Sequence, residues 1–219
     1  MTSSSDRIEK RFKSTASSRT FRNVRAYLGM ESRAVLDVGC AYGEFLALFG
    51  QGSVGITLEP EEAAYGRERG LVIMNGNVED ELFLRTLAHR FEIIFANNIL
   101  EHLYAPHTFL VESRQLLKSG GYIVVGVPCV PRIRSLMRFR KFRGSLAGQH
   151  INFFTRDTLR LTVERAGWIV EDVRGFRLKS GFFDHLFDLV YPHFYVIARL
   201  NPSFQYSEKR KRELRGYKP

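Results

Sequence analysis

Short apolar runs alternate with amphipathic stretches through the middle of the chain. Each run is followed by a longer segment with helical spacing, which is typical of a parallel sheet covered by helices on both faces. The strand-like runs are 34–38, 53–58, 71–74, 92–96 and 122–127, and the helix-like stretches between them are 43–49, 60–69, 79–89 and 105–118. The pattern therefore predicts a doubly wound α/β fold.

The two ends of the chain follow different patterns. Residues 1–30 are polar and basic, with a few apolar positions that indicate one or two helices. Near the other end, a helix-like stretch at 155–167 leads to a strand at 168–173, and a last strand-like run covers 194–200. No clean helix of crossover length separates these last two strands, which favours antiparallel pairing at the edge of the sheet. We expect a Rossmann-like, mostly parallel seven-stranded sheet with an antiparallel C-terminal strand.

Length and composition fit a single domain in a reducing compartment. With 219 residues and 44% hydrophobic positions, the chain can bury a core, so global disorder is excluded. We expect a basic helical segment at 1–30, the domain at 31–200 and a basic, flexible tail at 201–219.

Cys40 and Cys129 fit neither a disulfide framework nor a CxxC metal site, which indicates a reducing compartment. No apolar run reaches the roughly 18–20 residues of a membrane span, and the charged N-terminus is unlike a signal peptide. A cytoplasmic location is expected.

The net charge of +10 is concentrated in three basic segments, of which 132–144 is the most informative. It carries six basic and no acidic residues, and apolar side chains interleave with its arginines. Such a segment could attract a phosphorylated substrate, a lipid headgroup or nucleic acid, or could simply be solvated surface. We take 129–150 as a candidate acceptor-site element, with Arg138 and Arg140 as substrate-binding candidates.

An aromatic stretch at 176–192 is a second candidate acceptor-site element. Its rings include Phe182, Phe183, Phe187 and Tyr191. They could help to form the acceptor pocket, or they could be ordinary core between the last two strands. The core interpretation is favoured for at least half of them.

Chemistry-bearing residues gather where the first two strands end. Ligands of open α/β sheets lie beyond the carboxyl ends of the strands. The first strand ends in a glycine-containing turn that allows close backbone approach, and it contains Asp37, a buried carboxylate that needs a donor or a cation. The second strand ends at Glu59, where a carboxylate can accept hydrogen bonds from both hydroxyl groups of a ribose. Asp37 could instead only anchor the loop, and Glu59 could cap the next helix. Neither GxGxxG nor a P-loop is present.

These motifs resemble the class I S-adenosylmethionine-dependent methyltransferases, and in particular their small-molecule subgroup. The resemblance covers roughly residues 30–200, and its motifs occur in the family's order. They are VLDVGCAYGEFL (35–46), GITLEP (55–60), GNVED (76–80), FEIIFANNILEHL (91–103), LLKSGGYIVVGVP (116–128) and HINFFTRDTLRLTVERAGW (150–168). Each motif alone is weak, but six in order are specific.

The resemblance implies a set of residues that bind S-adenosyl-L-methionine, with S-adenosyl-L-homocysteine as the product. The methionine part would be held by Asp37, Gly39, Ala41, Gly43 and Asn97, the ribose by Glu59, and the adenine by Asn77 and Val78. Ala41 stands where the family often has glycine, and Asn77 where it often has aspartate. A methyl group is tolerable at the first position, and an amide oxygen can still accept a hydrogen bond at the second.

Methyl transfer to a hydroxyl group benefits from a general base. His150, after the basic segment, and His102, after the fourth strand, are the catalytic candidates. For Glu101 and His102 a structural role, packing under the cofactor loop and capping the next helix, is favoured. Quinone-pathway O-methyltransferases similar to this chain can carry a further carboxylate three residues before the Glu-His pair, used with it for metal. Asn98 stands at that position, so we expect no metal.

The acceptor is expected to be small or medium-sized, anionic and methylated on oxygen, such as a glycan, a nucleotide-sugar or a lipid-linked intermediate. The basic segments keep an RNA methyltransferase as the alternative, although Asn97-Asn98-Ile99-Leu100 lacks the motif of exocyclic-amine enzymes. Cys129 lacks the companion motif of a nucleophile and is expected to be a small buried residue. A non-catalytic cofactor-binding partner subunit and peripheral membrane contact also remain open.

Overall fold

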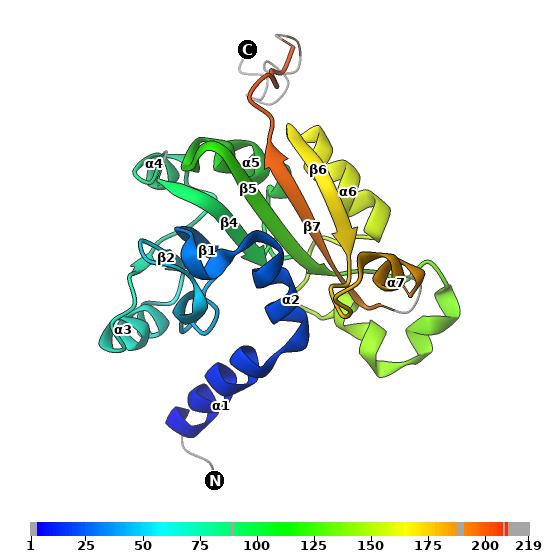
Figure 1. The fold of residues 1–219 in the computed structure, drawn as a ribbon, viewed down its shortest axis with the longest axis horizontal. Coiled ribbons are helices and arrows are strands. Elements are labelled where there is room, and N and C mark those ends of the chain that lie inside the picture. The colour runs from blue at the N-terminus through cyan, green and yellow to red at the C-terminus, as the bar shows by residue number, and fades with distance from the viewer. Residues whose placement is uncertain (1–3, 89, 188–190, 208, 210–219) are drawn as a thin grey trace.

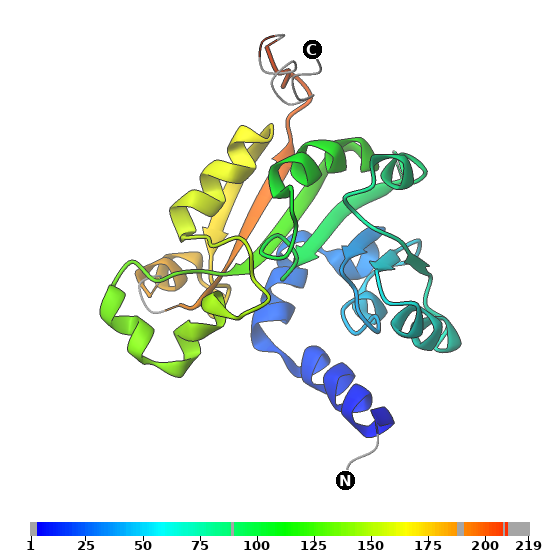
Figure 2. The same cartoon turned by 180° about the vertical axis from the view of Figure 1, so that it is seen from behind.

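The fold is a seven-stranded sheet, and helices cover both of its faces (Figures 1 and 2). The computed structural model describes residues 4–88, 90–187, 191–207 and 209. The strands are β1 (Val35–Val38), β2 (Val54–Thr57), β3 (Ile73–Asn75), β4 (Phe91–Asn97), β5 (Leu117–Pro128), β6 (Trp168–Arg174) and β7 (His193–Leu200). Their order is β3-β2-β1-β4-β5-β7-β6. All pairs formed among strands β1, β2, β3, β4 and β5 are parallel, whereas β7 is antiparallel to both of its neighbours, β5 and β6. The predicted fold class is confirmed.

The described residues also form seven α-helices and five 3-10 segments, of which the first two helices and the first 3-10 segment precede the first strand. The helices are α1 (Ser4–Ser17), α2 (Arg19–Leu28), α3 (Pro60–Glu68), α4 (Glu81–Arg85), α5 (Pro106–Glu112), α6 (Arg156–Arg165) and α7 (Gly181–Leu186). The 3-10 segments are η1 (Met30–Ser32), η2 (Leu46–Leu48), η3 (Ser113–Leu116), η4 (Arg134–Arg138) and η5 (Arg140–Leu146). None of the helices in the described ranges is long and apolar enough to cross a membrane.

The helix expected at 43–49 does not form. The chain there makes turns and the short 3-10 segment η2. Gly43 has a φ of 90°, which lies outside helical geometry. The rings of Phe45 and Phe49 pack instead on Phe21 of α2 and Phe95 of β4, with centroid distances of 4.7–5.8 Å. Packing between distant segments therefore outweighs the local helical pattern.

The last two strands pair antiparallel at the edge of the sheet, as expected. The inverted strand β7 lies inside the sheet, between β5 and β6, and β6 forms the edge. Burial gives the reason: Phe194–Ala198 are buried in succession, whereas β6 exposes Ile169 and Glu171. A continuously apolar strand is more stable inside a sheet than at its edge, because its apolar side chains are then better shielded from water.

Two apolar clusters fill the two faces of the sheet. One face packs Phe21, Val24 and Leu28 of α2 on residues such as Val35 and Phe95. The opposite face packs apolar residues of α4, α5 and α6 on the other side of the same strands. Figures 1 and 2 show α2 on one face and α4, α5 and α6 on the other. Because the parallel strands end at one edge of this sandwich, the loops that follow them gather there.

Candidate functional site

A cavity of about 510 Å³ lies at the carboxyl ends of the parallel strands. This volume is within the range of small-molecule sites, and the position is where open α/β sheets bind ligands. The cavity is lined by Gly39, Ala41, Ile56, Thr57, Leu58, Glu59, Glu62, Gly76, Asn77, Val78, Glu79, Ile99, His102, Leu103 and Tyr104. Five of the residues expected to hold the cofactor are therefore brought together: Gly39, Ala41, Glu59, Asn77 and Val78.

The turn after β1 forms one wall because its backbone is left-handed at three positions. Gly39, Ala41 and Gly43 have φ values of 73°, 48° and 90°. A Cβ on Gly39 would lie 2.6 Å from Ile99 Cδ1, so only glycine fits without a shift of that neighbour. The N–H groups of Gly39 and Cys40 both donate to the Ile56 carbonyl at 2.9 Å, which ties the turn to β2.

Gly43 is not among the residues that line the cavity. A Cβ there would meet the side chains of Leu71 and Ile73 at 2.6 and 3.2 Å. Its lack of a side chain lets the β1 turn pack closely against the segment that enters β3. Gly43 is thus placed to support the wall.

Asp37 lies beneath the turn as part of a buried charged group. Its side chain is outside the cavity lining and only 2% of the residue is exposed. Burial raises the pKa of Asp37 well above its ordinary value, the nearby Glu44 carboxylate raises it further, and the Leu46 N–H partly offsets both. Arg11 of α1 donates to Glu44 from Nε at 2.6 Å. The structure thus places Asp37 to anchor the turn. Contact with the methionine amino group stays a prediction.

Glu59 lies at the cavity wall with its carboxylate exposed. It is the residue that precedes α3, but its side chain makes no capping hydrogen bond, so the alternative role as a helix cap is wrong. Its N–H donates to Thr57 Oγ1 at 3.3 Å, and that hydroxyl donates to Glu62 Oε2 at 2.7 Å. Glu62 is a second acid of the wall that sequence reasoning missed. In the sequence, only its position three residues after Glu59, in the first turn of the next helix, could have pointed to Glu62.

The loop after β3 forms the opposite wall. Asn77 Oδ1 accepts a hydrogen bond from the Glu79 N–H at 2.9 Å, which closes a tight turn, and Val78 packs beside it with 6% exposure. The Glu79 carboxylate accepts from the N–H groups of Tyr104 and Ala105 at 3.2 and 2.7 Å. This acid, absent from the sequence candidates, joins the loops after β3 and β4 and so closes the cavity.

Asn97 ends β4 and Asn98 follows it, and their side chains lie toward β5 and β7. Asn97 lies outside the cavity lining, and its buried Oδ1 has no hydrogen-bond partner in the described part of the chain. Asn98 has a φ of 56°, and its Oδ1 accepts from His193 Nε2 at 2.9 Å. Burial and then the charge of Arg177 lower the pKa of His193 to about 4, so its ring is neutral at pH 7. The side-chain oxygen of Asn98 is therefore engaged in a hydrogen bond with His193 of β7.

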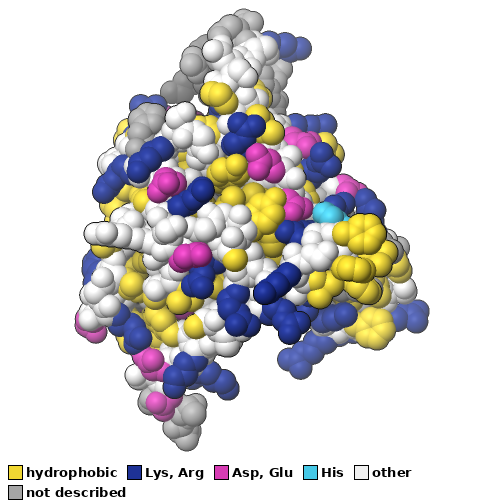
Figure 3. Space-filling model, viewed as in Figure 1, with side chains coloured by type: hydrophobic (Ala, Val, Ile, Leu, Met, Phe, Trp, Pro, Cys, Tyr) yellow, Lys and Arg dark blue, Asp and Glu magenta, His cyan; other side chains and the backbone are white. Residues whose placement is uncertain are grey.

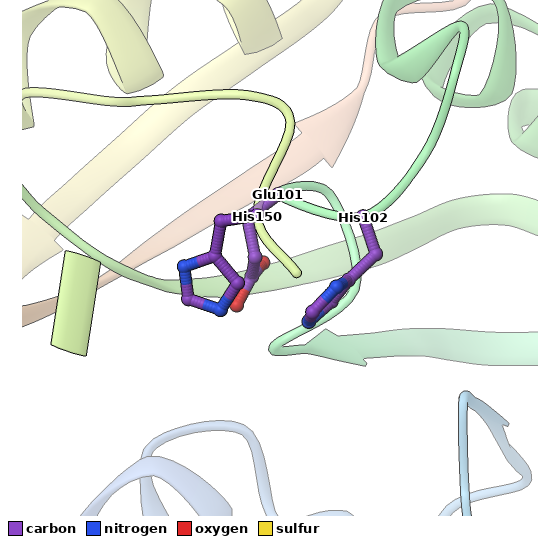
Figure 4. A group of neighbouring side chains, drawn as sticks. All are labelled: Glu101, His102 and His150. Atoms are coloured by element: carbon purple, nitrogen blue, oxygen red, sulfur yellow. The ribbon is translucent and has the colours of Figure 1, made fainter. Parts of the chain in front are cut away.

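Glu101, His102 and His150 form a cluster beside the cavity (Figure 4). The two imidazole rings lie edge to face with centroids 4.7 Å apart. His102 Nδ1 lies 3.1 Å from the Gln149 carbonyl, and His150 Nδ1 lies 3.4 Å from the Ser145 carbonyl. Carbonyl oxygens only accept, so these contacts put the ring proton on Nδ1 and leave Nε2 as an acceptor.

Glu101 is buried under the two rings. Only 1% of the residue is exposed, and neither carboxylate oxygen has a hydrogen-bond partner among the described residues. Burial raises the pKa of Glu101 to about 7, partly offset by its own backbone N–H. Its carbonyl accepts from the N–H groups of Ile151 and Asn152, which holds the segment of His150 in place. The residue at the N-cap of α5 is Ala105, and no side chain makes a capping hydrogen bond there. The helix-capping role expected for Glu101 and His102 is therefore wrong.

The cluster could in principle also hold a metal ion. One ligand atom from each of Glu101, His102 and His150 lies within 4.8 Å of the others. A carboxylate with two imidazoles is a donor set that divalent transition metals accept. Our expectation of a metal-free site depended on Asn98 and did not include His150, which only the fold brings to this place. The absence of metal stays a prediction.

The two candidate acceptor elements lie beside one another. A second cavity of about 380 Å³ separates the start of the basic segment from α7, and Arg132, Arg156 and Tyr191 are among its lining residues. Arg138 and Arg140 are exposed and line neither cavity. Phe182, Phe183 and Phe187 are exposed as well, so the expectation that half or more of the four aromatic residues are core is wrong.

Cys129 ends β5 as a buried residue rather than as a nucleophile. It is 1% exposed, and burial raises its pKa to about 12, so the thiol keeps its proton at neutral pH. The prediction of a small buried residue is confirmed. A C5-type methylation mechanism that uses this thiolate is not supported.

Comparisons with known proteins agree with this geometry. Residues 10–173 match the family described as a methyltransferase domain. A ubiquinone biosynthesis O-methyltransferase from Cereibacter sphaeroides is 30% identical over 110 residues, covering 47% of this chain and 44% of that protein. One from Histophilus somni is 35% identical over 106 residues, covering 43% and 44%. These matches span less than half the length of the curated relatives.

A solved structure shares the fold over nearly the whole chain. A SAM-dependent methyltransferase from Thermotoga maritima superposes with a TM-score of 0.62 at 16% identity, covering 89% of this chain and 95% of that one. The turn after β1, the acid after β2 and the loop after β3 converge on one cavity of suitable size, so the residues fit the cofactor. The chain belongs to the methyltransferase domain family and is a class I S-adenosylmethionine-dependent methyltransferase.

Proposed function

We propose that the protein methylates a hydroxyl group of a small or medium-sized anionic acceptor. The observation that carries this proposal is the pair of imidazoles at the cofactor cavity, His102 in its wall and His150 in contact with it. A hydroxyl holds its proton at neutral pH, so its methylation gains from a nearby base, whereas a charged sulfonium donor needs no further activation. The matched relatives named as O-methyltransferases support oxygen as the acceptor atom.

The proton of the acceptor hydroxyl goes to His102 in this proposal. Its Nδ1 faces the Gln149 carbonyl and carries the ring proton, so Nε2 has the free lone pair. S-adenosyl-L-methionine supplies, when bound, an electrophilic methyl group for in-line displacement. The walls around His102 fix the direction of approach, which is the main contribution of such a site. His150 positions the neighbouring ring and is the second candidate for the proton.

Arginines beside the second cavity support an anionic acceptor. Arg132 and Arg156 line it, and Arg156 is anchored by an Nη2 hydrogen bond to the Val173 carbonyl at 3.0 Å. Planar guanidinium groups bind carboxylate and phosphate oxygens well. Cys40 and Cys129 are both buried free thiols, which supports a reducing, cytoplasmic location.

The proposal is tested by measuring methyl transfer in His102→Ala, His150→Ala and the control His107→Ala. His107 lies on α5, outside both cavities, where its ring meets Tyr206. The assay follows release of S-adenosylhomocysteine with catechols, hydroxybenzoates and sugar phosphates as acceptors. We expect a fall in kcat of about 100-fold or more in His102→Ala, the scale of general-base catalysis. An unchanged kcat in both site variants would refute the assignment, and activity restricted to amine acceptors would refute oxygen.

A further inference from the structure

The surface beside the second cavity is rich in exposed aromatic and basic side chains. We call it the basic–aromatic face, made of the 132–146 segment and the 177–187 segment with α7. Its exposed apolar residues are Ile133, Phe139, Leu146, Phe182, Phe183, Leu186 and Phe187. Figure 3 shows hydrophobic side chains gathered over α7 with basic ones around them. The two segments lie side by side, since Arg132 and Leu186 line one cavity.

The aromatic side chains are held outward by the fold. Phe182 is 77% exposed and Phe183 is 54% exposed, and their rings pack edge to face at 5.5 Å. Between them and the sheet, Asp184 is fully buried and its Oδ1 accepts from the N–H groups of Arg177 and Leu178 at 3.1 and 3.0 Å. This anchor fixes the orientation of α7. Exposed rings on an anchored helix indicate an interaction surface rather than a loose core.

The exposed charges of the two segments are all basic, although Arg132 pairs with Asp157 of α6. Its exposed basic residues include Arg132, Arg138, Arg140, Lys141, Arg143, Arg177 and Lys179. No acidic residue occurs from 129 to 156, and the one acid of α7, Asp184, is buried. Arg138, Arg140 and Lys141 form no ion pair within the ranges that the structure describes. These charges are therefore available to an anionic partner.

We propose that the basic–aromatic face docks on an anionic phospholipid membrane surface. Aromatic and leucine side chains enter the boundary between headgroups and acyl chains, while arginines and lysines beside them bind anionic headgroups. Ile133, Leu146 and Leu186 favour lipid over nucleic acid, because aliphatic side chains insert among acyl chains but offer no plane on which a base can stack. The docking does not depend on the catalytic role of either histidine.

The position of the face gives the docking a consequence for the site. Residues 129–150 connect the end of β5 to His150, and the second cavity opens between the start of this stretch and α7. Docking therefore presents that cavity to the membrane surface. An acceptor that resides in the bilayer, or carries a lipid, would reach the protein at this edge.

The test is sedimentation of the full chain with vesicles of phosphatidylcholine alone and of phosphatidylcholine with 30% phosphatidylglycerol. We expect binding to the anionic vesicles only, weakening as salt rises. Arg138→Gln/Arg140→Gln should weaken binding by about 30-fold, since each basic residue at such a surface contributes a factor of about five. Phe182→Ser/Phe183→Ser should weaken it by at least about 10-fold.

Matched controls separate the face from general charge. Arg90→Gln/Lys118→Gln removes the same charge from exposed positions next to the first residues of β4 and β5, and Leu82→Ser removes an apolar side chain that is 74% exposed on α4. Both should bind vesicles like the unchanged protein. Circular dichroism and S-adenosylhomocysteine binding verify the fold of every variant.

Three results would overturn the proposal. The first is equal weakening in Arg90→Gln/Lys118→Gln and in the face variant, which would make the binding unspecific charge attraction. The second is tighter binding to a single-stranded RNA than to the anionic vesicles, which would assign the face to nucleic acid. The third is concentration-dependent dimerisation that Phe182→Ser/Phe183→Ser abolishes, which would assign it to a second copy of the chain.

Discussion

Burial of the Glu101 carboxyl without a partner has a consequence for stability against pH. The pKa of this group rises from an ordinary 4.5 to about 7, chiefly through burial. Below pH 4.5 the group is mostly protonated in both folded and unfolded chains, so it adds no ionisation penalty. Above pH 7 it is ionised in both, and the folded state carries the full penalty. A rise of this size corresponds to about 3 kcal/mol, which is lost as the pH increases from about 4.5 through 7.

Glu101→Gln removes this penalty with little change of shape. We therefore expect the variant to unfold with the same free energy as the unchanged protein at pH 4.5 and to be about 2–3 kcal/mol more stable at pH 8. Urea denaturation followed by circular dichroism at both pH values, with EDTA present, measures the difference. Because two imidazoles face the carboxyl, the comparison is repeated in His102→Ala/His150→Ala. Equal stabilities at pH 8 in both backgrounds would refute the view that Glu101 is buried as an unpaired charge.

Three further predictions concern the turn after β1, its support and the metal. Ala41→Gly relieves a left-handed alanine at φ 48° and should raise the free energy of unfolding by about 0.5–1 kcal/mol, measured by urea titration; a lower value would contradict strain at this turn. Arg11→Ala leaves the buried Glu44 without its cation and should lower stability by about 1–2 kcal/mol, an effect that Lys10→Ala, an exposed neighbour, should not reproduce. Incubation with EDTA should leave methyl transfer unchanged, and loss of activity restored by a divalent ion would instead assign a metal to Glu101, His102 and His150.

Local patterns were sufficient for much of the sheet and of the cofactor wall. Continuous apolar runs are local signals, and they placed the parallel strands within a few residues. Gly39 and Glu59 were found because each follows a strand, and the fold brings the ends of parallel strands together. Asn77 came from the resemblance of the 76–80 motif to the methyltransferase family. The position of β7 was not predictable in this way, because it depends on burial by two neighbours.

Contacts between distant segments were beyond the reach of the sequence. Arg11 and Glu44 pair across different elements, and Glu101 binds the backbone beside His150 through its carbonyl. No spacing in the chain encodes such pairs. The exposed rings of Phe182 and Phe183 were similarly misjudged, since an aromatic stretch favours the core unless a buried anchor such as Asp184 turns it outward.

The central claim, that the cavity at the strand ends binds the cofactor with Glu59 at its wall, is tested most directly by calorimetry. S-adenosylhomocysteine is titrated into the unchanged protein, Glu59→Ala and Glu68→Ala, an exposed acid at the far end of the same helix. We predict tight binding by the first and last proteins. Loss of charge-assisted hydrogen bonds to the ribose should weaken binding to Glu59→Ala by about 10-fold to 100-fold. Equal affinity in Glu59→Ala, or no binding by the unchanged protein, would contradict the account.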